Sequence, residues 1–142
     1  TEYFGHSYTS EESFENGWLR TGDIVTIDDE GYINIVDRAE DIIKSGGEWI
    51  SSIKIENIIM KHDGVIETAV IGVPDEKWQE RPAAFIIPDE SINPNTLTDR
   101  ITSHIESEYP SWWVPDTIEY VDKIPKTGTG KISKKDIREQ YI

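Results

Sequence analysis

Three glycine-bearing segments carry the residue types from which the chain could build a site for an anionic ligand. They are residues 18–23 (WLRTGD), 44–49 (KSGGEW) and 125–131 (PKTGTGK). Lysine and arginine attract phosphate and carboxylate groups, and glycine lets a backbone approach a ligand closely because it has no Cβ. Taken singly, each segment is more often an ordinary turn with a solvated charge. Their order and spacing therefore decide whether they act together.

The segment at residues 125–131 has the composition of a nucleotide loop but not its spacing. A P-loop needs a glycine five residues before Gly130 and a serine or threonine directly after the lysine. Pro125 and Ile132 occupy those two positions, so Lys131 is not the lysine of a P-loop.

The chain is acidic as a whole and basic at its C-terminal end. It has 28 Asp and Glu against 14 Lys and Arg, a net charge of −14. This excludes a general nucleic-acid binder, which needs a cationic face to displace counterions. Residues 1–41 contain eleven acidic residues and two basic ones, whereas residues 123–142 contain six basic residues and two acidic ones. We therefore expect an anionic ligand to meet the C-terminal tail.

Composition also limits the cofactors and the compartment. The chain has no cysteine, and hence no disulfide, thiolate nucleophile or Cys-based zinc site. His6, His62 and His104 show no metal-ligand spacing. No run approaches the ~20 apolar residues that span a bilayer, and no signal peptide is recognisable. We predict a soluble, cytoplasmic chain that binds no metal itself.

The hydrophobic pattern predicts a β-hairpin followed by a charged connector. The 142 residues, 36% of them hydrophobic, suffice for one domain with a modest core. β-rich runs at residues 24–28 and 32–36 flank a turn and predict the hairpin. Residues 37–41 form the connector, and residues 42–47 form a short apolar stretch that ends in a flexible loop. Residues 1–18 carry aromatic residues without a clean period, which indicates packing against something larger.

Helices and strands alternate after the connector. A helix is expected from Ser51 to His62 on the stripe of isoleucines that it contains. The other expected elements are strands at residues 67–73 and 81–88, a helix from Asn93 that stops at Pro110, a strand at 117–121 and a helix at 133–141. This order predicts an α+β fold with a small mixed sheet covered by helices and preceded by a short β-hairpin.

Taken together and in order, these segments resemble the C-terminal part of the adenylate-forming superfamily. Its members include acyl-CoA synthetases, firefly luciferase and the adenylation domains of peptide synthetases. The matching pieces are residues 17–23 (GWLRTGD), 37–50 (DRAEDIIKSGGEWI), 69–75 (AVIGVPD) and 125–131 (PKTGTGK). Within the superfamily, residues 46–49 (GGEW) and 77–82 (KWQERP) are most similar to medium- and long-chain fatty acyl-CoA synthetases.

The resemblance implies three parts of a longer enzyme. Residues 1–36 would be the end of a large N-terminal domain and the hairpin that leads to the hinge. Residues 37–41 would be the hinge, and residues 42–142 the mobile C-terminal AMP-binding-enzyme domain. The chain alone is then expected to be inactive, because the family's phosphate loop, adenine pocket and Mg²⁺-binding glutamate belong to the N-terminal domain.

The implied reaction is the ATP-dependent ligation of a fatty acid to CoA. The carboxylate attacks the α-phosphate of ATP to give an acyl-adenylate and pyrophosphate, and the CoA thiol then displaces AMP. The implied partners are the fatty acid, ATP, CoA and the N-terminal domain, which would hold Mg²⁺. A homodimer of the full enzyme is left open. Two other interpretations also stay open: a non-catalytic binding or interaction module with the same fold, and the same domain of an aryl or other acid–CoA ligase.

The resemblance assigns three residues to the adenylation step. Lys131 matches the family lysine that places a cation between the carboxylate and the polyphosphate, a role that suits a compact ammonium on a long stem. Asp23 matches the aspartate that accepts hydrogen bonds from both ribose hydroxyls. Arg38 matches an arginine near the ribose and the phosphates. Without the resemblance they are an exposed lysine, a turn-capping acid and half of a surface ion pair.

A second group of residues is assigned to the thiol step. Glu40 falls at the family's hinge, where backbone torsions change between two poses, although many members carry Asp or Lys there. Gly46 and Gly47 would line the tunnel for the pantetheine arm of CoA, with Lys44 meeting CoA or phosphate. Trp49 resembles a tryptophan that gates the acyl tunnel, and is otherwise a half-buried aromatic at the start of the next helix.

Overall fold

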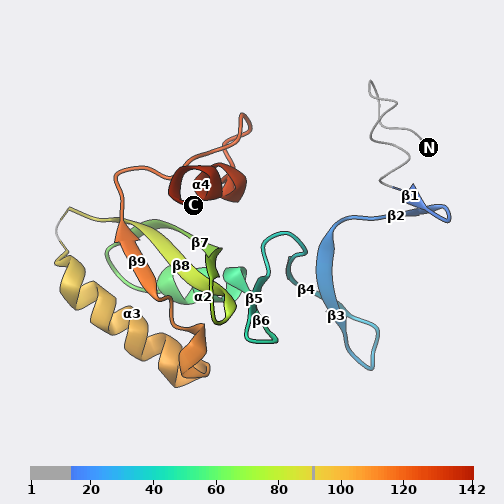
Figure 1. Ribbon diagram of the computed structural model, residues 1–142, viewed down its shortest axis with the longest axis horizontal. Helices are drawn as coiled ribbons and strands as arrows, with labels where there is room; N and C mark the ends of the chain where they lie inside the picture. The colour runs from blue at the N-terminus through green and yellow to red at the C-terminus, as the bar shows by residue number, and fades with distance from the viewer. Residues whose placement is uncertain (1–13, 91) are drawn as a thin grey trace. The chain divides into compact units, whose positions relative to one another are not determined.

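The computed structural model describes residues 14–90 and 92–142 (Figure 1). The chain forms two compact units, one ending at Glu40 and one beginning at Asp41. In the described residues the first unit consists of two β-hairpins, and the second contains a five-stranded sheet with three α-helices. No helix in these ranges is both long and apolar enough to pass through a membrane.

The first unit contains a short hairpin that the hydrophobic pattern does not predict. Strands β1 (Phe14–Glu15) and β2 (Trp18–Leu19) pair antiparallel on either side of a two-residue turn. Both turn residues have a positive φ, 52° at Asn16 and 83° at Gly17. Asn-Gly is the dipeptide that such turns favour. The signal is therefore present in the sequence, but the aromatic residues around it lack the period of a strand.

The second hairpin confirms the predicted one. Strand β3 (Asp23–Ile27) pairs antiparallel with β4 (Ile33–Arg38). The carboxylate of Asp28 accepts hydrogen bonds from two backbone amides of the turn, at 3.0 and 2.9 Å, and so closes it as an Asx motif does. At the other end of the ladder, Asp23 and Arg38 are register partners.

A five-stranded mixed sheet forms the centre of the second unit. Its strands are β5 (Ile43–Ser45), β6 (Glu48–Ile50), β7 (Val65–Asp75), β8 (Gln79–Pro88) and β9 (Thr117–Tyr120). The order is β6-β5-β8-β7, and β9 also pairs with β8. The β8–β9 pairing is parallel and the other pairings are antiparallel. The predicted mixed sheet is thereby confirmed.

Three α-helices cover the sheet, and a 3₁₀ helix follows the second of them. They are α2 (Ser52–Ile59), α3 (Pro94–Glu108), η1 (Ser111–Trp113) and α4 (Lys134–Tyr141). Ser51, Asn93 and Ser133 cap the three α-helices, and each side chain accepts a hydrogen bond from an amide of the first turn. These bonds satisfy donors that a helix leaves unpaired at its start.

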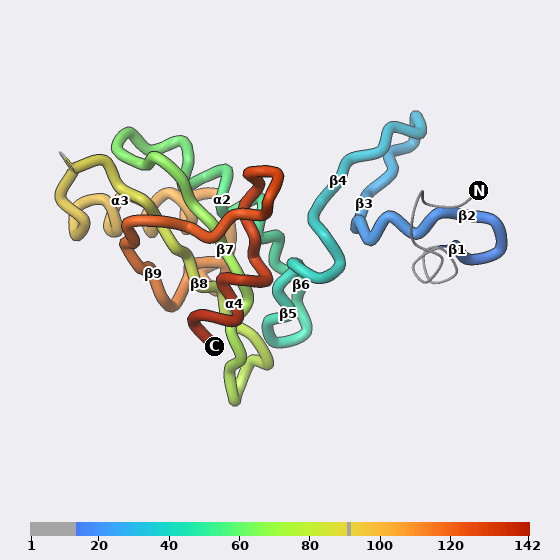
Figure 2. Tube along the Cα trace, turned by 90° about the horizontal axis from the view of Figure 1, so that it is seen from above, coloured from blue at the N-terminus to red at the C-terminus, as the bar shows by residue number. Residues whose placement is uncertain are grey.

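The sheet is covered on both faces because its residues alternate between two apolar clusters. Val70 of β7 packs in one cluster with Ile55 of α2 and Ile101 of α3. The next residue, Ile71, packs in the other cluster with Ile137 of α4. Helices α2 and α3 therefore lie on one face of the sheet and α4 on the other, as Figures 1 and 2 show.

Two segments differ from expectation. Helix α2 ends at Ile59 rather than His62, because the last amides bond three residues back, as in a 3₁₀ turn. Residues 42–47 do not end in a flexible loop. They lead into the β5–β6 hairpin, whose two turn residues Gly46 and Gly47 have φ values of 59° and 88°. Gly-Gly supplies the positive φ that a two-residue hairpin turn needs.

Candidate functional site

The predicted site residues divide between the two units. Those expected near the nucleotide, together with the predicted hinge residue, lie in the first unit: Asp23, Arg38 and Glu40. Those expected near CoA and the reacting groups lie in the second unit: Lys44, Gly46, Gly47, Trp49 and Lys131. Each unit therefore holds one part of the predicted machinery.

An ion pair joins Asp23 and Arg38 across the β3–β4 ladder. Nε of Arg38 lies 3.0 Å from Oδ1 of Asp23, and the two side chains are 58% and 21% exposed, respectively. The amide of Ala39 closes this end of the hairpin by donating to the carbonyl of Gly22 at 2.7 Å. The pair presents an acceptor and a forked donor side by side, a combination that suits ribose hydroxyls and phosphate. It is also the geometry of an ordinary surface ion pair.

Backbone hydrogen bonds fold the segment before Lys131 into a closed turn. The amide of Thr127 donates to the carbonyl of Lys131 at 2.7 Å, and the amide of Gly130 donates to the carbonyl of Thr127 at 2.9 Å. The amide of Lys131 in turn donates to the hydroxyl of Thr127 at 3.2 Å. Gly130 has a φ of 83°, which glycine adopts without strain. Thr127 and Gly130 therefore hold the backbone of the lysine in place.

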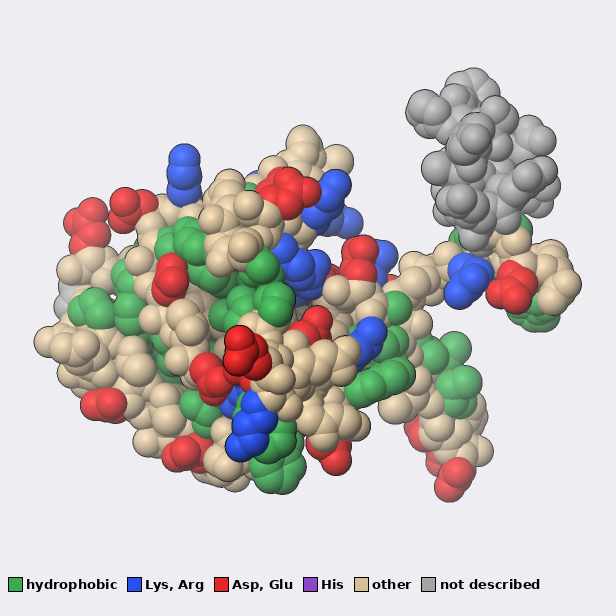
Figure 3. All heavy atoms as spheres, viewed as in Figure 1, with side chains coloured by type: hydrophobic (Ala, Val, Ile, Leu, Met, Phe, Trp, Pro, Cys, Tyr) green, Lys and Arg blue, Asp and Glu red, His purple; other side chains and the backbone are tan. Residues whose placement is uncertain are grey.

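Lys131 differs from most basic residues of the tail in its charge environment. Four of the others form ion pairs: Lys126 with Glu67, Lys134 with Glu56, Lys135 with Glu139 and Arg138 with Asp41. Lys131 is exposed, and among residues 14–90 and 92–142 no ion pair within 4.0 Å involves its ammonium group or that of Lys123. Figure 3 shows basic side chains around α4 and the segment that leads to it. The ammonium of Lys131 is thus available to an anion.

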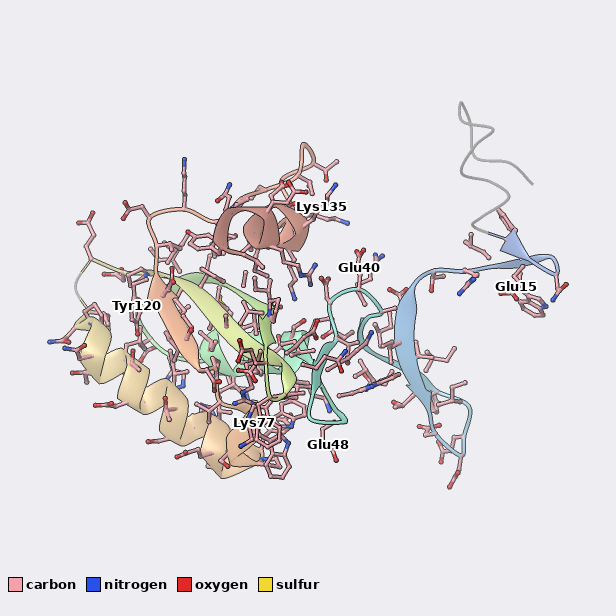
Figure 4. The ribbon with its side chains drawn as sticks, in the orientation of Figure 1. Glu15, Glu40, Glu48, Lys77, Tyr120 and Lys135 are labelled. Atoms are coloured by element: carbon pink, nitrogen blue, oxygen red, sulfur yellow. The ribbon has the colours of Figure 1, made fainter. Side chains whose placement is uncertain are left out.

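The Gly46–Gly47 turn borders a hollow of about 430 Å³. Its lining includes Ser45, Gly46, Trp78, Arg81, Trp112 and Asp116. The amide of Gly46 donates to the carbonyl of Trp78 at 2.8 Å. A Cβ on Gly46 would lie 2.8 Å from Cε3 of Trp78, so only glycine fits there without a shift of the indole. Figure 4 labels Glu48, which also lines the hollow, and Lys77, whose ammonium lies 4.5 Å from the centre of the Trp78 ring.

Arg81 of β8 lines this hollow and is not among the predicted site residues. Its side chain is only 10% exposed, and its Nε and Nη2 donate to the two carboxylate oxygens of Asp116 at 2.9 and 2.7 Å. These hydrogen bonds lower the pKa of Asp116 and raise the pKa of Arg81. The signal in the sequence is an arginine within an otherwise apolar strand, because a buried charge needs a partner.

Lys44 and Trp49 lie opposite each other on the β5–β6 hairpin. They are register partners, and strand alternation turns Lys44 away from the face that its neighbour Ser45 occupies. Trp49 is 60% exposed and lies in β6, so the alternative of a half-buried aromatic at the start of a helix is wrong. The structure therefore groups Gly46 with the hollow and Lys44 with Trp49.

Comparison with known proteins identifies the family. The AMP-binding enzyme C-terminal domain family matches residues 54–131. The chain belongs to this family. The match spans β7, β8, α3 and β9, and it ends at Lys131, the residue predicted to act in adenylation.

Curated relatives of this AMP-binding enzyme C-terminal domain include ligases for different acids. The chain is 44% identical over 137 residues to a peroxisomal trans-cinnamate:CoA ligase of Petunia hybrida. It is 42% identical over 141 residues to a long-chain-fatty-acid–CoA ligase of Thermus thermophilus. The alignments cover 96% and 98% of this chain but only 24% and 26% of the relatives. The chain therefore spans about a quarter of their length.

Solved structures of similar proteins have the same fold. A Mycobacterium tuberculosis fatty acyl CoA synthetase is 41% identical with a TM-score of 0.70, over 99% of this chain and 27% of that one. An anthranilate CoA ligase in complex with anthranoyl-AMP is 37% identical with a TM-score of 0.85, over 97% and 27%. The predicted α+β fold and the predicted membership of the adenylate-forming superfamily are both confirmed.

This AMP-binding enzyme C-terminal domain also brings together two histidines that lie far apart in the sequence. Nδ1 of His104 lies 3.0 Å from Nε2 of His62, and Nε2 of His104 lies 2.9 Å from Oε1 of Glu108. Burial is the main cause that lowers the pKa of His62. Even so, the described part of the chain has no three His, Cys, Asp or Glu side chains arranged to hold a metal ion. We interpret the chain of contacts as a link between the end of α2 and α3.

Proposed function

We propose that the chain is the C-terminal part of an ATP-dependent fatty acid–CoA ligase. The observation that carries this proposal is the state of Lys131. Its ammonium is exposed, forms no ion pair with the described residues, and stands on a closed Thr-Gly turn of a domain from an AMP-binding enzyme family. Because the relatives are about four times as long, we place the nucleotide pocket and the acyl pocket in the remainder of the enzyme.

Adenylation brings two anions together, the carboxylate and the triphosphate of ATP. We assign Lys131 the role of offsetting their repulsion. A carboxylate oxygen attacks the α-phosphorus of ATP, the bond from that phosphorus to the β-phosphate oxygen breaks, and pyrophosphate leaves. The ammonium of Lys131 would stabilise the negative charge that grows on the α-phosphate oxygens. An unpaired lysine does this without first breaking an internal ion pair. Mg²⁺ would neutralise the polyphosphate, and we place it in the preceding domain.

Asp23 and Arg38 are proposed to hold the nucleotide during this step. Asp23 would accept hydrogen bonds from both ribose hydroxyls, and Arg38 would contact the ribose or a phosphate. Their 3.0 Å contact supports the proposal because it keeps the acceptor and the donor adjacent. Replacing the ion pair between Asp23 and Arg38 by contacts to the nucleotide costs little free energy, because the Arg38 side chain is 58% exposed.

The Gly46–Gly47 turn is proposed to meet CoA in the second step. The thiol releases its proton to solvent, its sulfur attacks the acyl carbonyl carbon, and the bond from that carbon to the AMP oxygen breaks. The absence of Cβ atoms, the positive φ values and the adjoining hollow support a close approach of the pantetheine arm. Lys44 would meet a phosphate of CoA, and Trp49 would gate the acyl tunnel from its exposed position in β6.

One domain that serves both steps must bring Lys131 to the reacting groups in the first step and the Gly46–Gly47 turn in the second. We propose that residues 37–41 form the hinge and include the hinge residue Glu40, that residues 42–142 rotate, and that residues 1–36 stay with the N-terminal domain. Two observations support this division. The boundary between the compact units falls directly after Glu40, and the Glu40 residue is exposed.

The class of the acid is proposed from local similarity. Residues 46–49 (GGEW) and the 42% identity to a long-chain-fatty-acid–CoA ligase favour a fatty acid. An aryl acid is the second candidate, because the chain is 44% identical to a trans-cinnamate:CoA ligase and 37% identical to an anthranilate CoA ligase.

A substrate panel with the full-length enzyme tests the proposal. AMP release and ATP–pyrophosphate exchange are measured with acetate, octanoate, palmitate, cinnamate and anthranilate, each with and without CoA. We expect octanoate or palmitate to support both exchange and CoA-dependent AMP release. A maximum with cinnamate or anthranilate would replace the fatty acid by an aryl acid. Absence of exchange with every acid would favour a non-catalytic module.

A further inference from the structure

Every hydrogen-bond donor of the Arg81 side chain is engaged inside the protein. A guanidinium with its Nε has five N–H groups, and the structure gives five bonds. Nε donates to Asp116 at 2.9 Å, Nη1 to Ser45 Oγ at 3.1 Å and to the Trp112 carbonyl at 2.8 Å. Nη2 donates to the Val114 carbonyl at 3.4 Å and to Asp116 at 2.7 Å. The side chain is thus a fully satisfied structural contact.

This satisfaction argues against the obvious role of an arginine in a hollow, which is to bind an anionic ligand. A phosphate at Arg81 would have to displace the two-pronged ion pair with Asp116. The same ion pair lowers the pKa of Asp116 below its ordinary value of 3.8, so a ligand would have to displace a charged and already paired carboxylate. A ligand in the hollow therefore meets Arg81 as part of the wall, with no donor to spare.

The acceptors of Arg81 belong to segments that are distant in the sequence. Ser45 is 36 residues before Arg81 and directly precedes the Gly46–Gly47 turn. Trp112 and Val114 lie 31 and 33 residues after it, at the end of η1. One side chain of β8 therefore ties the glycine turn to the 3₁₀ helix on the other side of the hollow.

Apart from the β5–β6 ladder and the bond from the Lys44 amide to Oε2 of Glu80 at 2.7 Å, few contacts hold the glycine turn to β8. Strand β5 has three residues, and its register with β8 contains the single pair Ser45–Gln79. The amide of Gly46 bonds to the Trp78 carbonyl at 2.8 Å. Two successive glycines otherwise give the backbone wide conformational freedom. Ser45 is only 4% exposed, and its hydroxyl accepts a hydrogen bond from Arg81 directly before the two glycines.

We infer that Arg81 is a positioning residue that preorganises the Gly46–Gly47 turn for the thiol step by fixing Ser45 against η1 and Asp116. The inference rests on the proposed function, because it takes the turn to be the part that meets the thiol substrate. Arg81 acts before that substrate binds and offers no free hydrogen-bond donor to CoA or to the adenylate. Its loss should weaken CoA binding and leave adenylation intact.

Hydrogen exchange in the full-length enzyme tests whether Arg81 holds the turn. We expect the peptide that contains Gly46 and Gly47 to exchange at least about tenfold faster in Arg81→Lys, because an ammonium lacks the fork that reaches four partners. Ser45→Ala removes the one bond to the turn and should give a smaller increase at the same peptide. Ile101→Val in α3, which removes a buried methyl group away from the hollow, is the matched control for a general loss of stability.

The kinetic test separates positioning from a general loss of structure. With preformed acyl-adenylate, we expect the KM for CoA to rise about tenfold in Arg81→Lys and about threefold in Ser45→Ala, the order expected for one or two lost hydrogen bonds. ATP–pyrophosphate exchange should stay within about twofold of the wild-type rate in both variants. Ile101→Val should change neither quantity.

Each outcome decides the inference. Faster exchange at the turn together with a selective rise in the KM for CoA supports it. Unchanged hydrogen exchange at the Gly46–Gly47 turn overturns the inference. A KM for CoA that stays constant while hydrogen exchange at the turn becomes faster overturns it as well. If Arg81→Lys does not fold, Ser45→Ala decides the inference by the same two measurements. If the wild-type enzyme ligates no acid to CoA, the proposed function is refuted. The hydrogen-exchange data would still decide whether Arg81 holds the turn.

Discussion

Arg138 in α4 donates a hydrogen bond of 2.7 Å to the carboxylate of Asp41, which lies 97 residues earlier in the chain. Asp41 is the first residue of the second unit and directly follows the predicted hinge residue Glu40. Helix α4 begins three residues after Lys131, at Lys134. The pair therefore ties the helix that follows Lys131, the lysine proposed to act in adenylation, to the residue at which the unit begins.

Removal of this ion pair should destabilise the second unit. The side chains of Arg138 and Asp41 are 28% and 14% exposed, so their coupling should lie between that of a surface pair and that of a buried one, about 1–2 kcal/mol. Urea unfolding of the enzyme with Arg138→Gln, Asp41→Asn and the double variant measures it. The double variant should cost less than the sum of the single variants, and strictly additive costs would show that the contact is not stabilising.

Lys131→Ala should abolish most of the first half-reaction and spare the second. Loss of one charged donor to the transition state lowers rates by at least ~100-fold, which ATP–pyrophosphate exchange with the full-length enzyme would measure. Thioester formation from supplied acyl-adenylate should survive. Lys123→Ala is the matched control, because Lys123 is also an exposed lysine of the tail with no described ion pair. Equal loss of both half-reactions would contradict the role given to Lys131.

Glu40→Pro should have the opposite effect to Lys131→Ala: it should spare adenylation and block the thiol step. A proline fixes φ near −65°, so it obstructs the rotation between the two poses while the adenylation pose persists. Exchange of pyrophosphate is expected to continue, and transfer of the acyl group to CoA to stop. Glu40→Ala, which removes the carboxylate but leaves φ free, should retain both half-reactions. Normal CoA ligation by the proline variant would end the assignment of the hinge to this residue.

Local patterns in the sequence are sufficient to predict most of the fold. The isoleucine stripe of α2, the caps at Ser51 and Asn93, and the alternation in β7 and β8 each determine one element through short-range physics. The β5–β6 hairpin is not predicted, because a Gly-Gly pair indicates a tight turn and a flexible loop equally well.

Contacts between distant segments cannot be predicted in this way. Arg81 and Asp116 are 35 residues apart, and the sequence around either residue does not indicate which residue it pairs with. The same holds for His62 with His104 and for Asp41 with Arg138. The glycines of the candidate site are visible in the sequence, whereas the side chains that hold them are recognisable only once the sheet has brought its segments together.

The two glycines of the β5–β6 turn should respond differently to alanine. Both have a positive φ, which an L-residue adopts at a cost of about 1–2 kcal/mol. A Cβ at Gly47 meets nothing within 4 Å, whereas one at Gly46 would lie 2.8 Å from the Trp78 ring. Gly46→Ala should therefore raise the KM for CoA clearly more than Gly47→Ala, because it also displaces an indole that lines the hollow. Equal effects in steady-state assays with the full-length enzyme would mean that the hollow is not part of the CoA path.

The burial of His62 should make stability depend on pH below the ordinary histidine pKa of 6.5. Burial lowers the pKa of His62 below its ordinary value of 6.5, the charges of His104 and Arg100 lower it further, and Asp63 opposes them. Below pH 6.5 the unfolded state therefore binds a proton that the folded state resists, so the free energy of unfolding falls as the pH drops through this range. The contribution of His62 is complete above pH 6.5.

Urea unfolding of the enzyme at about pH 7.5 and about pH 5.5, on either side of the ordinary histidine pKa, checks this sign. The wild type should lose stability at the lower pH, and His62→Gln should lose less, because glutamine does not titrate. Glu108, whose pKa is lowered chiefly by its hydrogen bond to His104, acts in a separate and more acidic window below its ordinary value of 4.5. A glutamine variant with the full wild-type loss between the two pH values would show that another group controls the transition.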